Sequence, residues 1–241
     1  LAGPGDWTIW RAPTDNDRVI VAEWRQANYD HSQVRVHSLR AETIHHQVCL
    51  HFEAVIAGVG RQPALSFQGH WCLDQEGRLK LCLEGHRPKE MVELPRFGLV
   101  LPMVEADRVS YIGYGPYENY VDKHHSSYWG YFEQSAQDLY EPYVTPQENG
   151  AHQVTKLAVQ QGPLALSVAS SHALSFNLSP YSTRQLSQAR HRDELVEEGV
   201  YYLHLDYRQA GIGSNSCGPR LLPEYRLDQA SFKFDWTFEL R

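Results

Sequence analysis

The C-terminal segment alternates strictly between apolar and polar side chains. From position 232 to position 240, four aromatic residues and a leucine occupy every second position, with charged or hydroxylated residues between them. Because successive side chains of a strand point to opposite faces, this pattern predicts a half-buried antiparallel strand. The same reading applies to five further segments, residues 48–56, 79–83, 164–168, 174–178 and 201–207. The sequence therefore predicts an all-β fold.

Helical patterns are few and short. They are confined to residues 21–27 and to a segment after Ser182, where Gln185 completes a capping box. Neither helix is long enough to connect parallel strands. Ten or more antiparallel strands do not stay as one flat open sheet, so we expect two packed, twisted layers. With no internal repeat and no low-complexity linker, the prediction is one large antiparallel β-sandwich domain spanning residues 1–241.

Charge and hydropathy exclude two classes of partner. The 241 residues carry a formal net charge of -7, and no basic run could follow a phosphate backbone. No stretch approaches the roughly 18 consecutive apolar residues of a membrane helix. We therefore expect no nucleic acid and no membrane partner. The chain begins at Leu1, from which we expect a fragment or a processed piece of a longer protein.

The four cysteines are too sparse for a disulfide scaffold. A turn at residues 74–77 would place Cys72 near Leu79 and Cys82 near Gly69, so that these two cysteines do not face each other. Free thiols and a reducing, cytoplasmic compartment are the expectation. No Cys or His cluster has the spacing of zinc ligands, so we predict no metal site.

Four loops concentrate Gly, Pro, Asn and acidic residues. They read WRAPTDND (10–17), GYGPYENYVD (113–122), YVTPQENG (143–150) and GIGSNSCGP (211–219). Glu118 and Glu148 each precede an asparagine. Two carboxylates about 5 Å apart would suit a retaining glycosidase and about 6.5–9.5 Å an inverting one. The alternative is that both carboxylates bind backbone amides of irregular turns.

Other candidate sites in the chain have plain structural explanations. The adjacent His124 and His125 point to opposite faces of an extended segment, which disfavours a shared metal ion. A second histidine pair, His45 and His46, lies in an alternating strand. Residues 15–17 lack the spacing of a calcium loop, and the glycines at 211 and 213 lack the helix of a dinucleotide site. Exposed aromatic rings beside Asn and Asp could form a sugar platform, or simply fill the sandwich.

Taken together and in this order, the four loops resemble the C-terminal domain of the large β-galactosidases of glycoside hydrolase family two. Some members of the family encode this domain as a separate small subunit. The resemblance covers the chain from about Trp10 to its end. It implies a galactose mutarotase-like supersandwich that follows a sugar-binding domain, two immunoglobulin-like domains and a (β/α)₈ barrel. That architecture agrees with the alternation of the strands.

The resemblance also implies where the chemistry lies. In the family both catalytic glutamates stand at the ends of barrel strands, so this chain is expected to hold no catalytic residue. The motif residues are expected to have structural roles: Arg11, Asp15, Asn16, Asp17, Glu118, Asn119, Tyr120, Asp122, Glu148 and Asn149. The glycine-rich loop is expected to line the leaving-group side of the active site through Ser214, Asn215, Ser216 and Cys217. Some members carry a tryptophan where this chain has Cys217.

The function implied by the resemblance is retaining hydrolysis of β-galactosides such as lactose, with this chain as a non-catalytic part. Its expected partners are the catalytic barrel, in the same chain or as a large subunit, the β-galactoside, and further copies of the enzyme. No cofactor is expected in this chain, and magnesium is expected in the barrel. Two other functions remain open: a stand-alone mutarotase-like enzyme, which needs a His and a carboxylate converging on a sugar, and a galactoside-binding module.

Overall fold

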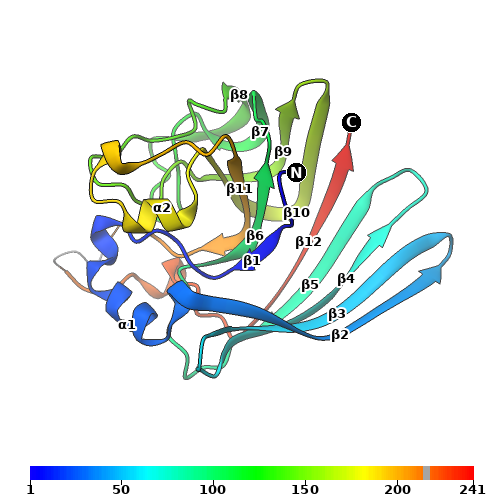
Figure 1. Cartoon of the computed structure of the whole chain (residues 1–241), viewed down its shortest axis with the longest axis horizontal. Helices are drawn as coiled ribbons and strands as arrows, with labels where there is room; N and C mark the ends of the chain where they lie inside the picture. The colour runs from blue at the N-terminus through cyan, green and yellow to red at the C-terminus, as the bar shows by residue number, and fades with distance from the viewer. Residues whose placement is uncertain (214–217) are drawn as a thin grey trace.

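A computed structural model describes residues 1–213 and 218–241 of the chain (Figure 1). In this part of the chain twelve strands form one hydrogen-bonded, antiparallel sheet. The strands are β1 Asp6–Thr8, β2 Ser32–Ile44, β3 Gln47–Gly58, β4 Pro63–Leu73, β5 Leu79–His86, β6 Arg96–Met103, β7 Arg108–Gly115, β8 Tyr128–Ser135, β9 His152–Gln161, β10 Leu164–Ser179, β11 Tyr201–Gln209 and β12 Ser231–Leu240. The all-β prediction is confirmed.

Strand β10 is the point at which the sheet forks. One edge of β10 pairs with β9, which continues through β7 to β8. The other edge pairs with two different strands: residues 166–170 bind β12, and residues 175–179 bind β11. Two wings leave this edge. We call β11, β6 and β1 the short wing, and β12, β5, β4, β3 and β2 the long wing.

The two wings pack on each other through aromatic rings. Phe97 of the short wing lies 5.5 Å from Phe67 and 5.5 Å from Phe232 of the long wing, measured between ring centroids. Trp7 of β1 stacks on Phe97 at 5.4 Å. The predicted sandwich is therefore confirmed, with one difference. Its layers are not separate sheets, because β10 joins them by continuous hydrogen bonding.

Local sequence signals account for most elements. The apolar positions Phe232, Phe234, Trp236 and Phe238 of β12 are buried, as the alternation predicts. Segments 164–168 and 174–178 belong to one strand, β10, whose pairing with β9 is irregular between Ala169 and Leu174. The alternation of side chains thus predicted the extent of β12 but not the continuity of β10.

The two predicted helices are confirmed as α1 Ile20–Gln26 and α2 Thr183–Gln188. The side chain of Ser182 accepts a hydrogen bond from the backbone of Gln185 at 3.2 Å, which is the predicted N-cap. Short 3₁₀ turns complete the described elements: η1 Asp15–Arg18, η2 Tyr29–His31, η3 Arg192–Glu194 and η4 Pro223–Tyr225. Both helices lie on the side of the molecule away from the tips of the long-wing hairpins (Figure 1).

The expectation of free thiols is wrong for two cysteines. Cys49 and Cys72 face each other across β3 and β4 and form a disulfide, whereas Cys82 is free. The pairing of Cys82 is also one residue from the prediction, because it lies opposite His70. The turn that was placed at 74–77 includes Arg78, whose carbonyl accepts from the amide of Asp74 at 3.0 Å. A lengthened turn shifts the register of the whole hairpin.

The histidine pair at 45 and 46 is not inside a strand, as had been expected. Both residues have a positive φ, 48° and 65°, and they form the turn between β2 and β3. This backbone conformation is typical of two-residue hairpin turns. Within the described residues, no helix is both long enough and apolar enough to cross a membrane.

Candidate functional site

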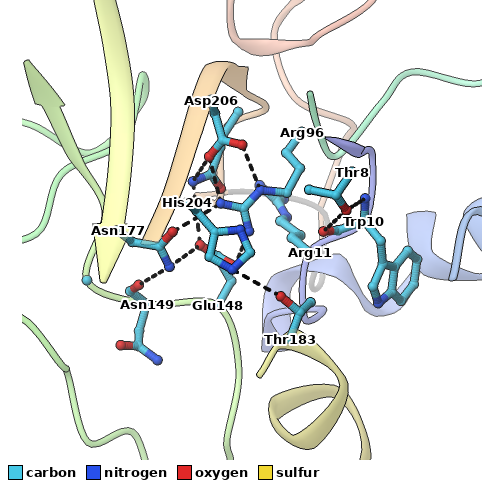
Figure 2. Close-up of polar contacts among 12 residues, drawn as sticks. Thr8, Trp10, Arg11, Arg96, Glu148, Asn149, Asn177, Thr183, His204 and Asp206 are labelled. Carbon is cyan, nitrogen blue, oxygen red and sulfur yellow. Dashed lines mark hydrogen bonds and ion pairs between the residues drawn. The ribbon is translucent and has the colours of Figure 1, made fainter. Parts of the chain in front are cut away.

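Residues of the first and third motif loops lie beside a buried cluster of ionisable side chains at the start of β6 (Figure 2). Arg96 is fully buried and binds Asp206 of β11 with two hydrogen bonds, at 3.0 Å from Nε and 2.6 Å from Nη2. Its Nη1 donates to Glu148 at 3.0 Å, and its Nη2 also donates to Asn177 of β10 at 3.1 Å. One guanidinium thus joins β6, β10, β11 and the third motif loop.

Two amide side chains complete the hydrogen bonding of Glu148. Asn177 Nδ2 donates to Oε1 of Glu148 at 3.2 Å and to the carbonyl of Asn149 at 3.3 Å. Gln209 Nε2 donates to the same Oε1 at 3.5 Å and to Asp206 at 3.2 Å. The carboxylate of Glu148 is therefore occupied by three protein donors inside the molecule.

Arg11 ties the first motif loop to the base of the fourth. Its guanidinium binds Asp17 through Nε at 3.1 Å and Nη2 at 2.7 Å. The same group donates to the carbonyls of Ala210 at 2.7 Å and Gly211 at 3.0 Å. Asp17 in turn accepts from the backbone of Thr14 at 2.9 Å, which shapes the first loop. Both members of this ion pair are buried.

The second motif loop binds the same segment, residues 210–213, which we call the loop stem. Asp122 accepts from the amide of Ile212 at 3.0 Å and from the amide of Gly213 at 2.7 Å. Asn16 Nδ2 donates to the carbonyl of Ile212 at 2.6 Å. A Cβ at position 211 would lie 2.5 Å from the Asp122 carboxylate, so glycine permits this approach. Residues of the first and second sequence motifs thus fix the course of the stem.

Glu118 holds the second motif loop against the third. Its carboxylate accepts from the amide of Gly150 at 2.8 Å, from Lys123 Nζ at 2.5 Å and from the hydroxyl of Tyr143. Gly150 has a φ of +68°, and a Cβ there would meet the carbonyl of Leu139 at 2.1 Å. The glycine of the third motif is therefore required by both its backbone conformation and its surroundings.

The remaining motif residues bind neighbouring backbone or other motif side chains. Asn119 donates to the carbonyls of Tyr114 at 2.9 Å and Tyr117 at 3.1 Å and accepts from the amide of Gln153 at 2.9 Å. Asn149 accepts from the amide of Glu141 at 3.1 Å.

Two further motif residues differ from this pattern. The side chain of Asp15 is exposed and its amide donates to Gln147. Tyr120 is buried, but its hydroxyl has no hydrogen-bond partner among the described residues.

The strand residues of this cluster were not predicted from the sequence. Asn177, His204 and Asp206 lie in segments whose alternation predicts a polar face toward water, whereas Arg96 and Gln209 lie outside the predicted strands. Instead, both faces of β11 are buried from Leu203 to Asp206, because the motif loops cover the polar face. Alternation alone cannot distinguish a polar face that meets water from one that meets polar loops.

Burial dominates the electrostatics of the cluster. It raises the pKa of Glu148 and of Asp206, and the charge of Arg96 partly offsets this effect. Burial alone would lower the pKa of Arg96, but Asp206 and Glu148 raise it above its ordinary value. Burial lowers the pKa of His204 well below its usual range, and Arg96 lowers it further. His204 is therefore neutral, with Nε2 at 3.3 Å from the Thr183 hydroxyl (Figure 2).

The predicted leaving-group residues Ser214, Asn215, Ser216 and Cys217 lie outside the described residues. The structure therefore places their attachment, the loop stem, but not the residues themselves. Within residues 1–213 and 218–241, no group of three or more His, Cys, Asp or Glu side chains is placed to hold a metal ion.

Comparison with known proteins establishes the family. The sequence model of the β-galactosidase small chain matches residues 2–240. The chain belongs to the β-galactosidase small chain family. It is 38% identical to the β-galactosidase of Actinobacillus pleuropneumoniae over 239 residues, which cover 98% of this chain and 24% of that protein. It is 36% identical to the β-galactosidase of Staphylococcus xylosus, covering 96% of this chain and 23% of that protein.

This small chain thus spans about a quarter of the length of these curated relatives. Among solved structures it is similar to the galactose 1-epimerase of Lactobacillus acidophilus NCFM, with a TM-score of 0.48 and 12% identity. That similarity covers 85% of this chain and 66% of the epimerase. A putative aldose 1-epimerase of Escherichia coli K12 gives a TM-score of 0.41 at 9% identity.

His152 predicts a dependence of stability on pH. Burial lowers its pKa to about 4, whereas an unfolded histidine titrates near 6.5. Between these values the unfolded chain binds more protons, so the free energy of unfolding falls as the pH falls through this window. From pH 7 to pH 5 we expect His152 alone to cost about 2 kcal/mol.

The variant His152→Phe keeps a ring against Tyr111, which lies 5.0 Å away, and should lose that part of the pH dependence. Urea unfolding at pH 7 and pH 5 measures it, with the exposed His37→Phe as the matched control. An unchanged pH dependence in His152→Phe would contradict the assignment.

Proposed function

We propose that this small chain is a non-catalytic part of a β-galactosidase that hydrolyses terminal β-galactosides, such as lactose, with retention. In this proposal residues 1–241 form a single domain that packs on a catalytic barrel, in the same chain or as a large subunit. The barrel supplies both catalytic glutamates and any magnesium. The complete enzyme is a homo-oligomer; the Cys49–Cys72 disulfide removes the free-thiol argument for a cytoplasmic location.

The observation that carries the proposal is the convergence of the first and second motif loops on the loop stem. Arg11, Asn16 and Asp122 bind the backbone from Ala210 to Gly213 with five hydrogen bonds between 2.6 and 3.0 Å. Such bonds fix a loop at its base, which suits a loop that must present groups to a substrate held by another domain. Ser214, Asn215, Ser216 and Cys217 follow the stem directly, and we propose that they line the leaving-group side.

The bonding of the two motif glutamates supports a non-catalytic role. Glu118 is bound by an amide, an ammonium and a hydroxyl, and Glu148 by a guanidinium and two amide side chains. A nucleophile or general acid needs an oxygen that faces substrate. Here the oxygens face loops of the same chain, so we propose structural roles for both residues.

A second candidate function has one supporting observation. The polar face of the long wing forms a groove of about 780 Å³, in which His51 Nε2 lies 2.7 Å from Glu42 Oε1. A paired histidine and carboxylate beside an open groove could move protons on a sugar ring, as a mutarotase-like enzyme must. This candidate predicts activity in the chain alone.

Activity assays on the isolated chain distinguish the two candidate functions. Purified free of other glycosidases, it should leave a chromogenic β-galactoside intact, because the reactive carboxylates belong to the barrel. It should also leave the rate of galactose mutarotation unchanged in a polarimeter. Galactoside turnover that is lost in Glu118→Gln or Glu148→Gln would contradict the proposal. Acceleration of mutarotation that is lost in Glu42→Gln would favour the second candidate instead.

The leaving-group role is tested at position 217. A tryptophan there would add an aromatic contact to a leaving glucose, worth about 0.5–1.5 kcal/mol, or roughly a two- to tenfold change in affinity. In the complete enzyme, Cys217→Trp should therefore tighten competitive inhibition by glucose by that factor. Inhibition by galactose, which occupies the other side of the scissile bond, serves as the internal control. Unchanged glucose inhibition would argue against a leaving-group role for this position.

A further inference from the structure

The strands of the long wing are longer than the strands of the short wing that cover them. Strands β2, β3 and β4 contain 13, 12 and 11 residues, whereas β6 contains 8 and β1 contains 3. At about 3.3 Å per residue, the long wing extends roughly 10–15 Å beyond its cover. Trp7 of the short wing contacts Phe67 and Trp236, whereas Trp71, nearer to the hairpin tips, contacts Phe238 of its own wing at 5.5 Å.

The apolar face of the long wing continues into the part that extends beyond the short wing. Phe238 of β12 is buried and lies opposite Leu79 of β5. Leu79 lies opposite Leu73 of β4, and Leu73 lies opposite Val48 of β3. Residues directly opposite each other in an antiparallel pair share one face of the sheet. This row of side chains is therefore a continuation of the face that forms the core.

Six apolar side chains of this face are between 46% and 64% exposed. We call them the overhang patch: Val36 and Leu39 of β2, Val48 of β3, Leu73 of β4, Leu164 of β10 and Leu240 of β12. The two β2 residues lie opposite Ala54 and Phe52, which are both buried. Leu240 lies opposite Leu166, two residues from Leu164. All six side chains thus share the core face.

The alternation of side chains persists where no strand of this chain covers the apolar face. The opposite face of the same strands carries Ser38, His51 and Lys233. None of the six side chains of the overhang patch carries a charge or a hydrogen-bonding group. A contiguous apolar surface that crosses several strands is typical of an interaction site. Its lack of polar groups is typical of an interface that stays closed, because permanent interfaces are more apolar than transient ones.

The length of the relatives indicates which partner covers the overhang patch. The matched region is 24% of one β-galactosidase and 23% of another, so about three quarters of each relative lies outside it. A domain linked to this chain, or assembled with it in every copy of the enzyme, has a high effective concentration at the patch. A second copy of the small chain has no such advantage.

The overhang patch is a different surface from the loop stem. The first motif loop, which binds the stem, leads into α1. The hairpin tips of the long wing lie on the side of the molecule away from α1 (Figure 1). A contact at the patch therefore adds a second attachment, far from the loop that is proposed to line the substrate pocket.

We propose that the overhang patch is permanently covered by an apolar surface from the part of the β-galactosidase outside these 241 residues. This inference rests on the proposed function in one respect, that the small chain works as part of a longer enzyme. In the complete enzyme the long wing is then a sandwich along its whole length. The short wing covers one part of its apolar face, and the rest of the enzyme covers the other.

The test is the rate at which a maleimide labels single cysteines in the complete enzyme. Leu39→Cys places a thiol in the overhang patch, and Ser38→Cys is the matched control on the opposite face of the same strand. Both positions are exposed in the small chain. In the complete enzyme, Leu39→Cys should be labelled at least about 100-fold more slowly than Ser38→Cys, because its thiol reacts only when the interface opens. Peptide mass spectrometry separates these sites from Cys82 and Cys217.

A photo-crosslinking experiment identifies the occupant. A benzophenone amino acid at position 39 of the complete enzyme should form cross-links to polypeptide outside residues 1–241. Hydrolysis of a chromogenic β-galactoside by the same preparation is measured in parallel. That activity tests the proposed function and does not report on the patch, so failure of one is distinguishable from failure of the other.

Two results would overturn the inference. Labelling of Leu39→Cys within tenfold of the rate of Ser38→Cys would show that the patch is open in the complete enzyme. Cross-links confined to residues 1–241, within one copy or between two copies, would show that the small chain itself covers the patch.

Discussion

The buried ion pair between Arg96 and Asp206 is the interaction on which the arrangement of this small chain depends. Removing two charges from water costs several kcal/mol each, and their attraction repays this only when geometry and hydrogen bonding are good. Here both atoms of the Asp206 carboxylate are bound by the guanidinium, and Glu148 and Asn177 occupy its other donors. The attraction offsets the cost of burial only while all four groups stay in place. The cluster therefore holds together β6, β10, β11 and the third motif loop.

Further contacts connect the Arg96 cluster to the motif loops and the loop stem. Glu148 fixes the third motif loop, and the backbone of Glu148 donates to the carbonyl of Ala12 in the first loop at 3.1 Å. The guanidinium of Arg11, paired with Asp17, binds the carbonyls of the loop stem, and Asp122 of the second loop binds its amides. The buried acidic residues of the motifs therefore hold the loops in place. These contacts support our proposal that a partner domain carries out galactoside cleavage and that this chain shapes the pocket.

The structural features that depend only on local sequence pattern were predicted from the sequence. The alternation of β12 and the Ser182 cap required no knowledge of distant contacts, and both are confirmed. The fork at β10, the Cys49–Cys72 disulfide and the Arg96 cluster could not be predicted, because each depends on which strands become neighbours. In β11, His204 and Asp206 have the spacing of a solvent-facing polar row, yet loops far away in the sequence bury them. The motif loops were recognised as structural candidates, but the attachment of the third loop to Arg96 through Glu148 was not predicted.

Amide hydrogen exchange in the variant Arg96→Lys tests the central claim most directly. Lysine keeps the charge but cannot bind Asp206, Glu148 and Asn177 in the planar geometry of a guanidinium. The amides of Glu148 and Gly150, which are bonded to Ala12 and Glu118, should then exchange at least about tenfold faster than in the wild type, while those of β12 change less. The exposed Arg78→Lys should change neither. Equal exchange at Glu148 and Gly150 in Arg96→Lys and the wild type would contradict the account.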